Sequence, residues 1–398
     1  MTDYRLPTGF SAAGVYCGIK TDPSKLDLAL FVSDRPAVAA GVFTQNQVCG
    51  APVKVSRERV PAGDARAVVI NSGIANAATG ERGIEDARWM TSEIASRIDC
   101  DSEAVLVCST GVIGNFLSRE TLASGFDAVV NGLDHSHAAY LAGATGMMTT
   151  DTVAKRSVRD VTVSGGTTVR VSGAAKGAAM IAPDMATMLA VVMTDAELTP
   201  EVATVFLRDA VNDSFNSISV EGHTSTSDTV LLLANGASAC GPLSPKDQDK
   251  VYGAIREVCT ELAQAIIRDA EGAAHFVTIN ATGFATISDA REVCKTVAND
   301  ALVKTAVTGN DPNWGRIISA CGRTSVKLTE ENLSLKINGV QIYASGAPTE
   351  FSIGAVSAAM ATGEVVFDIE SNLGECNARF WTSDLTQEYV RLNSEYTT

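Results

Sequence analysis

One threonine of this sequence stands where a hydroxyl could be presented for chemistry. Thr187 lies between a turn that contains Gly177 and Pro183 and the apolar residues 188–193. The length and branched content of that apolar run are typical of a fully buried strand. Pro183 fixes its own φ and favours extended geometry at the residue before it, which stiffens the backbone that enters the Ala186–Thr187 bond. The pattern predicts a hydroxyl held at the start of a strand.

Such a hydroxyl can cut its own chain. If Thr187 Oγ1 attacks the carbonyl carbon of Ala186, an ester replaces the peptide bond, and its hydrolysis leaves Thr187 as a new N-terminus. The free α-amine can then take the proton of its own hydroxyl, because an α-amine has a pKa of about 7.7–8.0. Strand preferences alone explain the same threonine as a half-buried β-former. Ala186 and Thr187 alone therefore fit both a self-cleavage site and an ordinary strand.

An acyl transfer also needs hydrogen-bond donors for the negative charge of its tetrahedral intermediate. Thr110 and Gly111 follow an apolar run that ends at Cys108. The glycine amide can approach a ligand closely, and the threonine hydroxyl can donate beside it. A simple strand-to-helix turn would explain this pair equally well. We expect Cys108 itself to pack as a small apolar residue rather than to act as a nucleophile.

Several sequence blocks together resemble one family of enzymes. Residues 176–195 resemble the self-cleavage motif of the ornithine acetyltransferase family, also called glutamate N-acetyltransferase or ArgJ, in which a lysine-glycine pair precedes a proline and an Ala-Thr-Met-Leu cleavage site. Further blocks resemble those of the family in the same order and span nearly the whole chain: CSTGVIG (108–114), MTTDT (148–152), TSTSD (224–228), DAEG (269–272), DPNWGR (311–316) and YVRLNSEYTT (389–398).

The resemblance implies an architecture. It implies a layered α/β fold of the ArgJ type, with a threonine nucleophile that self-cleavage exposes at a new N-terminus. The two products would be an α chain of residues 1–186 and a β chain of residues 187–398. Because the strand that begins at Thr187 must stay in a sheet with residues from before the cut, we expect the two chains to be intertwined. The resemblance further implies an assembly of two α and two β chains.

The resemblance also implies substrates and a site. N-acetylornithine would donate an acetyl group, and glutamate would accept it, as a step of arginine biosynthesis. Roles carry over to these residues: Thr187 as nucleophile; Thr110 and Gly111 as the oxyanion pair; Lys176 against an α-carboxylate; Glu271 against the δ-ammonium of ornithine; Thr149, Asn393 and Thr398 in the substrate pocket; Ala186 and Thr187 at the cleavage site.

Each of these residues also has an ordinary structural explanation. A lysine such as Lys176 usually lies on a solvated surface. Glu271 can be a charge that ends a helix before Gly272. Asn393 and Thr398 lie near a chain end, and chain ends usually fray. If the implied roles hold, the C-terminus must fold back into the site.

The implied cycle is ping-pong. Thr187 takes the acetyl group from N-acetylornithine, releases ornithine and passes the acetyl group to the amine of glutamate. We expect no metal and no organic cofactor, because ester exchange uses neither. Asp134, His135 and His137 are the only local cluster of metal-ligand type, and we expect them at the surface. The residues do not settle whether acetyl-CoA also serves as a donor, which separates bifunctional from monofunctional members.

Two other classes of function stay open. An amidase or aminopeptidase would use the same N-terminal nucleophile with water as the acceptor; a threonine nucleophile beside Lys176 and Glu271 favours transfer between charged amino acids instead. A binding protein without catalysis could hold an anion in the glycine-rich turn at residues 309–315. Glu221 and His223 stand where the family pattern has aspartates, which puts the chemistry of that loop in doubt.

Composition limits the remaining choices. The chain has 398 residues, of which 45% are hydrophobic, and can bury a sizeable core in two or three domains. Its net charge of −15 argues against nucleic acid and anionic membranes as partners. Nine cysteines without a CxxC pair indicate reduced thiols in the cytoplasm. No apolar run approaches the roughly 20 residues that span a bilayer.

The elements that must position these residues alternate along the chain, which predicts a mixed α/β fold. Apolar runs that end in turn residues predict strands at 67–71, 104–108, 229–234, 276–280, 333–337 and 365–369. Apolar residues three or four apart predict helices at 83–98 and 251–268. Thr199, Pro200 and Glu201 predict the start of a helix that ends near residue 215. We expect the charged residues 242–250 to form a solvated loop.

Overall fold

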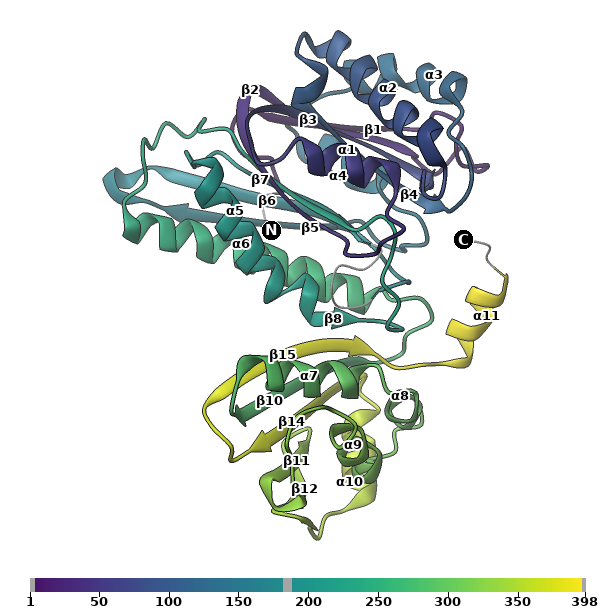
Figure 1. Cartoon of the computed structure of the whole chain (residues 1–398), viewed down its shortest axis with the longest axis vertical. Coiled ribbons are helices and arrows are strands. Elements are labelled where there is room, and N and C mark those ends of the chain that lie inside the picture. Colours follow the sequence, from purple (N-terminus) through teal and green to yellow (C-terminus); the bar gives the residue numbers. More distant parts are fainter. Residues whose placement is uncertain (1–3, 182–187, 396–398) are drawn as a thin grey trace.

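Two mixed β-sheets organise the computed structural model, which describes residues 4–181 and 188–395. Within these residues, the first sheet has eight strands in the order β4-β3-β2-β9-β7-β6-β5, with β1 paired to β2. Its strands are β1 (Phe10–Val15), β2 (Leu28–Phe43), β3 (Ala62–Ile74), β4 (Val105–Val112), β5 (Lys155–Thr162), β6 (Thr168–Lys176), β7 (Leu189–Thr194) and β9 (Thr229–Ala234). Figure 1 shows this sheet in the upper part of the molecule.

The second sheet lies below the first in Figure 1 and has seven strands among the described residues, in the order β13-β12-β11-β14-β10-β15-β8. They are β8 (Ile218–Ser219), β10 (Phe276–Phe284), β11 (Leu333–Ile337), β12 (Val340–Ala344), β13 (Ala347–Pro348), β14 (Glu364–Ser371) and β15 (Cys376–Ser383). Helices α7 (Ile287–Ala298), α8 (Ala301–Thr308), α9 (Trp314–Cys321) and α10 (Ile353–Met360) accompany this sheet, and the residues between them form one apolar core. The layered α/β class is therefore confirmed.

Helices cover the first sheet in two groups. One group packs on β2, β3 and β4 and consists of α1 (Ala51–Glu58), α2 (Gly80–Ile98) and α3 (Arg119–Asn131). The other group, α5 (Pro200–Asn212) and α6 (Pro245–Arg268), packs on β6, β7 and β9. The opposite face of these strands meets α4 (His137–Gly146) and residues of β2 to β4. All six residues of β7 are buried as a result, which explains its continuous apolar sequence.

Strand β7 joins the parts of the chain on either side of residues 182–187. It pairs antiparallel with β6, where Lys176 lies opposite Leu189, and parallel with β9, where Leu189 lies opposite Thr229. Segments from before and after the predicted cleavage site are therefore neighbours in one sheet, as we expected. The predicted strand start at Thr187 lies outside the described residues, and β7 begins at Leu189.

Most predicted elements are present in the structure. The strands at 229–234 and 333–337 have the predicted bounds, and the others are somewhat longer than predicted. Thr199 caps α5 by accepting a hydrogen bond from the backbone N–H of Val202, and Pro200 occupies the first turn. The helix ends at Asn212, earlier than predicted, because a short 3₁₀ turn (Phe215–Ser217) follows it.

The expected solvated loop at residues 242–250 is wrong in its second half. Helix α6 begins at Pro245, and the Ser244 hydroxyl caps it by accepting from the N–H of Asp247. Asp247 is buried, and its carboxylate accepts a hydrogen bond from the N–H of Ser164 at 3.0 Å. The local charge density suggested solvent, whereas a cap, a first-turn proline and a distant backbone partner favour a helix start.

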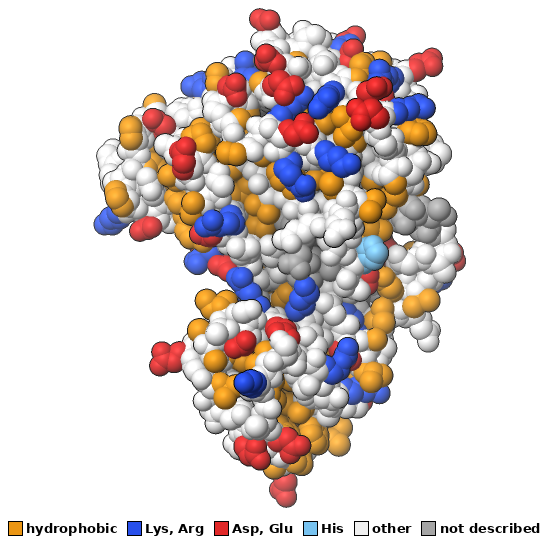
Figure 2. Space-filling model, in the orientation of Figure 1, with side chains coloured by type: hydrophobic (Ala, Val, Ile, Leu, Met, Phe, Trp, Pro, Cys, Tyr) orange, Lys and Arg blue, Asp and Glu red, His pale blue; other side chains and the backbone are white. Residues whose placement is uncertain are grey.

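The last helix, α11 (Gln387–Glu395), stands apart from both sheets, at the right-hand edge of the molecule in Figure 1. None of its residues is fully buried. On the face shown in Figure 2, basic and acidic side chains are interspersed. Among the described residues, no helix combines the length and apolar character needed to cross a membrane.

Candidate active site

Predicted site residues from distant parts of the sequence meet at one pocket. It has a volume of about 120 Å³. The predicted residues that line it are Thr110, Gly111, Thr149, Lys176, Glu271 and Asn393. Its other lining residues include Ala179 and Met180 from the end of the first described segment and the hydroxyl residues Ser225, Thr226 and Ser227. Ala186, Thr187 and Thr398 lie outside the described residues.

Lys176 is buried at the end of β6, so the ordinary expectation of a surface lysine is wrong. Its Nζ donates a hydrogen bond to Thr110 Oγ1 at 3.1 Å. Burial lowers the pKa of Lys176, and the nearby carboxylate of Asp151 opposes this shift. Burial would raise the pKa of Asp151, but Lys176, Lys155 and the N–H of Gly177 hold it at about 2. The carboxylate of Asp151 therefore stays ionised beside the buried lysine.

A buried ionic cluster supports this lysine, and sequence reasoning missed it. Lys155 Nζ lies 2.6 Å from Asp151 Oδ1 and 2.6 Å from Asp269 Oδ2. Asp151 also accepts hydrogen bonds from the N–H of Thr149 at 3.0 Å and the N–H of Gly177 at 2.7 Å. The cluster therefore fixes both Thr149 and the turn that follows Lys176. Asp151 and Asp269 stand in the MTTDT and DAEG blocks, which was the available signal.

Thr110 and Gly111 lie within the end of β4, and not in a strand-to-helix turn. The strand continues to Val112, and α3 begins only at Arg119. Gly111 has a φ of 129° and lies against β3, where an added Cβ would overlap the carbonyl carbon of Gly73. Because Thr110 Oγ1 accepts from Lys176, its own hydroxyl hydrogen remains available to donate. The lysine thereby orients a donor at the pocket.

Glu271 and the C-terminal helix meet at the same pocket. Glu271 lies beyond the end of α6, and its N–H donates to the carbonyl of Ala178 at 2.9 Å. Asn393 Nδ2 of α11 donates to Glu271 Oε2 at 3.0 Å. The C-terminal region therefore does return to the site, as predicted. A buried cation and a carboxylate that line one small pocket can bind a zwitterionic amino acid through both of its charged ends.

Two carboxyl groups, one from the buried Asp228 and one from the partly buried Glu221, hold the chain on either side of residues 182–187. Glu221 accepts a hydrogen bond from the N–H of Ile181, and Asp228 Oδ1 accepts one from the N–H of Met188 at 3.0 Å. Burial raises the pKa of Glu221 to about 8 and raises that of Asp228 well above its ordinary value. The second oxygen of each carboxyl is buried and has no hydrogen-bond partner among the described residues. Burial therefore shifts both groups toward the protonated form, relative to an exposed carboxyl.

Sequence reasoning left Glu221 without a role, because its partner, a backbone N–H, carries no sequence signal. His223, the other departure from the family pattern, is exposed. Cys108 is buried in an apolar cluster, and burial raises the pKa of its thiol to about 12, which confirms its packing role. Within residues 4–181 and 188–395, no three His, Cys, Asp or Glu side chains are grouped to hold a metal ion.

Comparisons with known proteins agree with this geometry. Residues 11–398 match the model of the ArgJ family. The arginine biosynthesis bifunctional protein ArgJ of Rhodopirellula baltica is 43% identical over 401 residues, covering 100% of this chain and 97% of the relative. The protein of the same name from Geobacter sulfurreducens is 42% identical over 397 residues, covering 98% and 99%. The crystal structure of the arginine biosynthesis bifunctional protein argJ from Bacillus halodurans is 34% identical, with a TM-score of 0.51, and covers 52% of this chain and 98% of that chain.

Proposed function

The chain belongs to the ArgJ family and is an enzyme of the glutamate N-acetyltransferase type, and from this premise we propose that it transfers acetyl from N-acetylornithine to glutamate. One observation carries the proposal: Thr110, Gly111, Thr149, Lys176, Glu271 and Asn393, which come from separate blocks of the sequence, line a single pocket. The reaction needs no metal and no organic cofactor in this scheme. We place it in the cytoplasm as a step of arginine biosynthesis.

The pocket charges support N-acetylornithine as the donor. N-acetylornithine carries an α-carboxylate and a δ-ammonium, and glutamate carries two carboxylates and an α-amine. In the proposed complex, Lys176 pairs with the α-carboxylate, while Glu271, with Asn393 beside it, pairs with the δ-ammonium. Thr149 supplies a further hydrogen bond. A pocket with two cations, in place of one cation and one carboxylate, would favour a different class of substrate.

In the proposed maturation, Thr187 Oγ1 attacks the carbonyl carbon of Ala186. The C–O bond forms as the C–N bond breaks, and the hydroxyl proton passes to the nitrogen, which becomes the free α-amine of Thr187. Water then hydrolyses the ester and leaves the carboxylate of Ala186. The buried carboxyl of Asp228 accepts a hydrogen bond from the N–H of Met188, the residue after Thr187. This contact supports the proposed cleavage, because it holds the backbone next to the bond that would break.

In the proposed cycle, the Thr187 hydroxyl attacks the acetyl carbonyl of N-acetylornithine while its own amine accepts the proton. The Thr110 hydroxyl and the Gly111 N–H stabilise the oxyanion, for which each donor contributes about 2.7–4 kcal/mol in comparable enzymes. The amine then protonates the departing ornithine. Glutamate repeats these steps in reverse, and N-acetylglutamate leaves. The relatives are named bifunctional proteins, so acetyl-CoA is the second donor that we propose to assay.

The proposed products are a chain of residues 1–186 and a chain of residues 187–398 that remain associated. Strand β7 supports this, because it is paired with strands from both sides of the proposed cut. The Bacillus halodurans relative supports it as well. The match covers 98% of that crystallised chain but only 52% of this one, so the crystallised chain is about half as long as this protein. We propose an assembly of two α and two β chains.

The proposal is tested by measuring the intact mass and the N-terminal sequences of the purified protein. We expect two fragments, the second beginning Thr-Met-Leu-Ala, and acetyl transfer from N-acetylornithine to glutamate. The Thr187→Ala variant should remain one chain without transfer. Rapid transfer by this variant would rule out the nucleophile. Acetate release at the same rate with and without glutamate would instead identify an amidase.

A further inference from the structure

The position of α11 poses a physical problem. This helix carries Asn393 to the pocket, yet none of its residues is fully buried, and Tyr389 is only partly covered. A nine-residue helix is marginal in water without a packed apolar face. Its placement must therefore depend on how its first residues are held.

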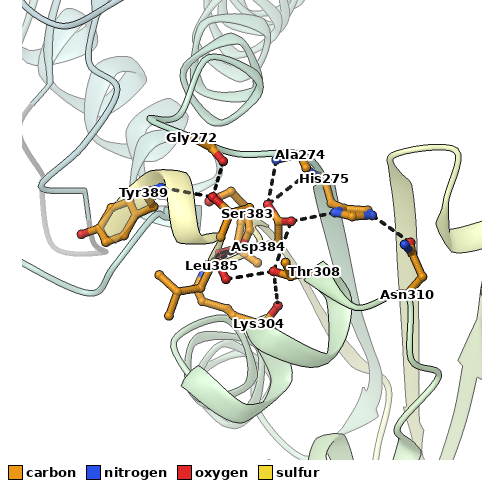
Figure 3. Close-up of polar contacts among 12 residues, drawn as sticks. Gly272, Ala274, His275, Lys304, Thr308, Asn310, Ser383, Asp384, Leu385 and Tyr389 are labelled. Atoms are coloured by element: carbon orange, nitrogen blue, oxygen red, sulfur yellow. Dashed lines mark hydrogen bonds and ion pairs between the residues drawn. The ribbon is translucent and has the colours of Figure 1, made fainter. Parts of the chain in front are cut away.

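Asp384, just before this helix, makes the principal attachment (Figure 3). Its buried Oδ1 accepts hydrogen bonds from the N–H of Ala274 at 2.9 Å and the N–H of His275 at 3.2 Å. Its Oδ2 lies 2.7 Å from His275 Nδ1 and accepts from Thr308 Oγ1 at 3.3 Å. The carboxylate thus joins the root of α11 to the residues that follow Glu271.

The other side of the His275 ring reaches a third segment. His275 Nε2 lies 3.0 Å from Asn310 Oδ1, and Figure 3 shows the imidazole between Asp384 and Asn310. Asn310 has a φ of 52° in the turn between α8 and α9, where Asn313 of the DPNWGR block caps α9. This sequence block, which had no role in the site, shapes the turn from which Asn310 contacts His275. His275, which stands alone in the sequence, is central to this contact.

Two further hydrogen bonds complete the attachment. Thr386 Oγ1 donates to the carbonyl of Gly272 at 2.6 Å and accepts from the N–H of Tyr389 at 3.1 Å, so one hydroxyl caps α11 and ties it to the Glu271 loop. The loop is tied in turn to the pocket wall through Ala178. Two routes therefore connect His275 to the pocket. One runs back along the chain to Glu271, and the other runs through Asp384 to Asn393.

We propose that His275, Asp384 and Asn310 form a clasp that positions Glu271 and Asn393 at the pocket and thereby sets the affinity for the substrate's δ-ammonium end. These are positioning residues, since they act through Glu271 and Asn393. The inference rests on the proposed function for the identity of the substrate. The anchoring of α11 does not, and it can be measured separately.

The test compares His275→Ala, His275→Gln and Asn310→Gly with the wild-type protein. Asn310→Gly removes the amide at a positive φ that glycine adopts freely. For His275→Ala we expect normal formation of both fragments, faster hydrogen exchange in residues 387–395, and a KM for N-acetylornithine raised about tenfold, as the loss of a hydrogen bond to a charged group would give. The kcat should change by less than about threefold, because Lys176, Thr110 and Gly111 are untouched. His275→Gln, which keeps a donor for Asp384, should recover part of the loss.

A matched control is Arg291→Ala. Arg291 Nη2 lies 2.9 Å from Asp213 Oδ1 in an exposed ion pair between α7 and the end of α5. It should leave both the exchange of residues 387–395 and the KM unchanged. Unchanged exchange and KM in His275→Ala, or equal effects in Arg291→Ala, would overturn the clasp. If His275→Ala is insoluble, the same two readouts in Asn310→Gly decide. A wild-type protein without acetyl transfer would overturn the proposed function, whereas faster exchange in His275→Ala would still support the clasp.

Discussion

At the scale of single residues, burial gives several ordinary side chains their roles. Lys176 is a common surface residue type, but here it is buried and donates to Thr110. Glu221 and Asp228 are charged residue types that burial shifts toward the neutral state. None of this could be predicted from neighbouring sequence, because the groups that bury and pair these residues lie tens of positions away. The resemblance placed Lys176 in the site, while the sequence around it did not.

The hydroxyl of Thr110 provides the first prediction. We expect Thr110→Ala to fold and to mature, but to transfer acetyl about 100- to 1,000-fold more slowly, because one oxyanion donor is lost. The KM should change much less than kcat, which steady-state kinetics can separate. Thr305→Ala, at an exposed position on α8, is the control and should behave as the wild type. An equal loss in both variants would point to a folding defect.

The carboxyl of Glu221 predicts a pH dependence of stability. Its folded-state pKa of about 8 exceeds the ordinary value of 4.5, so between these values the folded state holds a proton that the unfolded state has released. Stability should therefore fall as pH rises from about 4.5 to about 8. Two nearby charges also act on the pKa of Glu221: Lys304 lowers it and Glu271 raises it. Burial lowers the pKa of Lys304 itself to about 7.

Glu221→Gln should flatten this dependence by mimicking the protonated acid. We expect its free energy of unfolding, relative to the wild type, to improve by about 1 kcal/mol or more between pH 5 and pH 8. Urea unfolding at several pH values measures the difference. Parallel curves for the two proteins would show that Glu221 is ionised across this range.

At the scale of elements, patterns within one segment predicted segments well. Strands β9 and β11 have the predicted bounds, because each is an apolar run between clear turn residues. The predicted start of α6 was wrong, because the charges of residues 242–250 suggested solvent and outweighed the local cap of Ser244 and Pro245. The N–H of Ser164, which donates to Asp247, lies in another part of the chain and gave no signal. The network around His275 was missed for the same reason: three residues more than thirty positions apart in sequence form it.

Gly272 shows how one element restricts another. It has a φ of 65°, and a Cβ at this position would overlap the N–H of Tyr389 at the start of α11. We therefore expect Gly272→Ala to displace α11, to raise the KM for N-acetylornithine about tenfold or more, and to speed hydrogen exchange in residues 387–395. Gly354→Ala is the control, since that glycine lies in α10 with open space around it. A normal KM in Gly272→Ala would mean that α11 does not control the pocket.

At the scale of the whole molecule, the arrangement of strands predicts how the mature protein behaves. Strand β7 contributes hydrogen bonds to both β6 and β9, so the two proposed fragments share one sheet and one core. We expect them to elute together from a sizing column under native conditions and to separate only in denaturant. Separate elution of intact, folded fragments would contradict the shared sheet.

The central place of β7 also fixes an order of events. Strand β7 is buried and has partners from both sides of residues 182–187, so we expect it to reach its position only when most of the first sheet has assembled. In the proposed maturation, the nucleophile is the residue that leads into this strand. The Ala186–Thr187 bond would then break only in a chain that has already folded. A new N-terminus would therefore mark a chain that had folded correctly. Misfolded copies would remain uncleaved and inactive, so folding itself would control which copies gain activity.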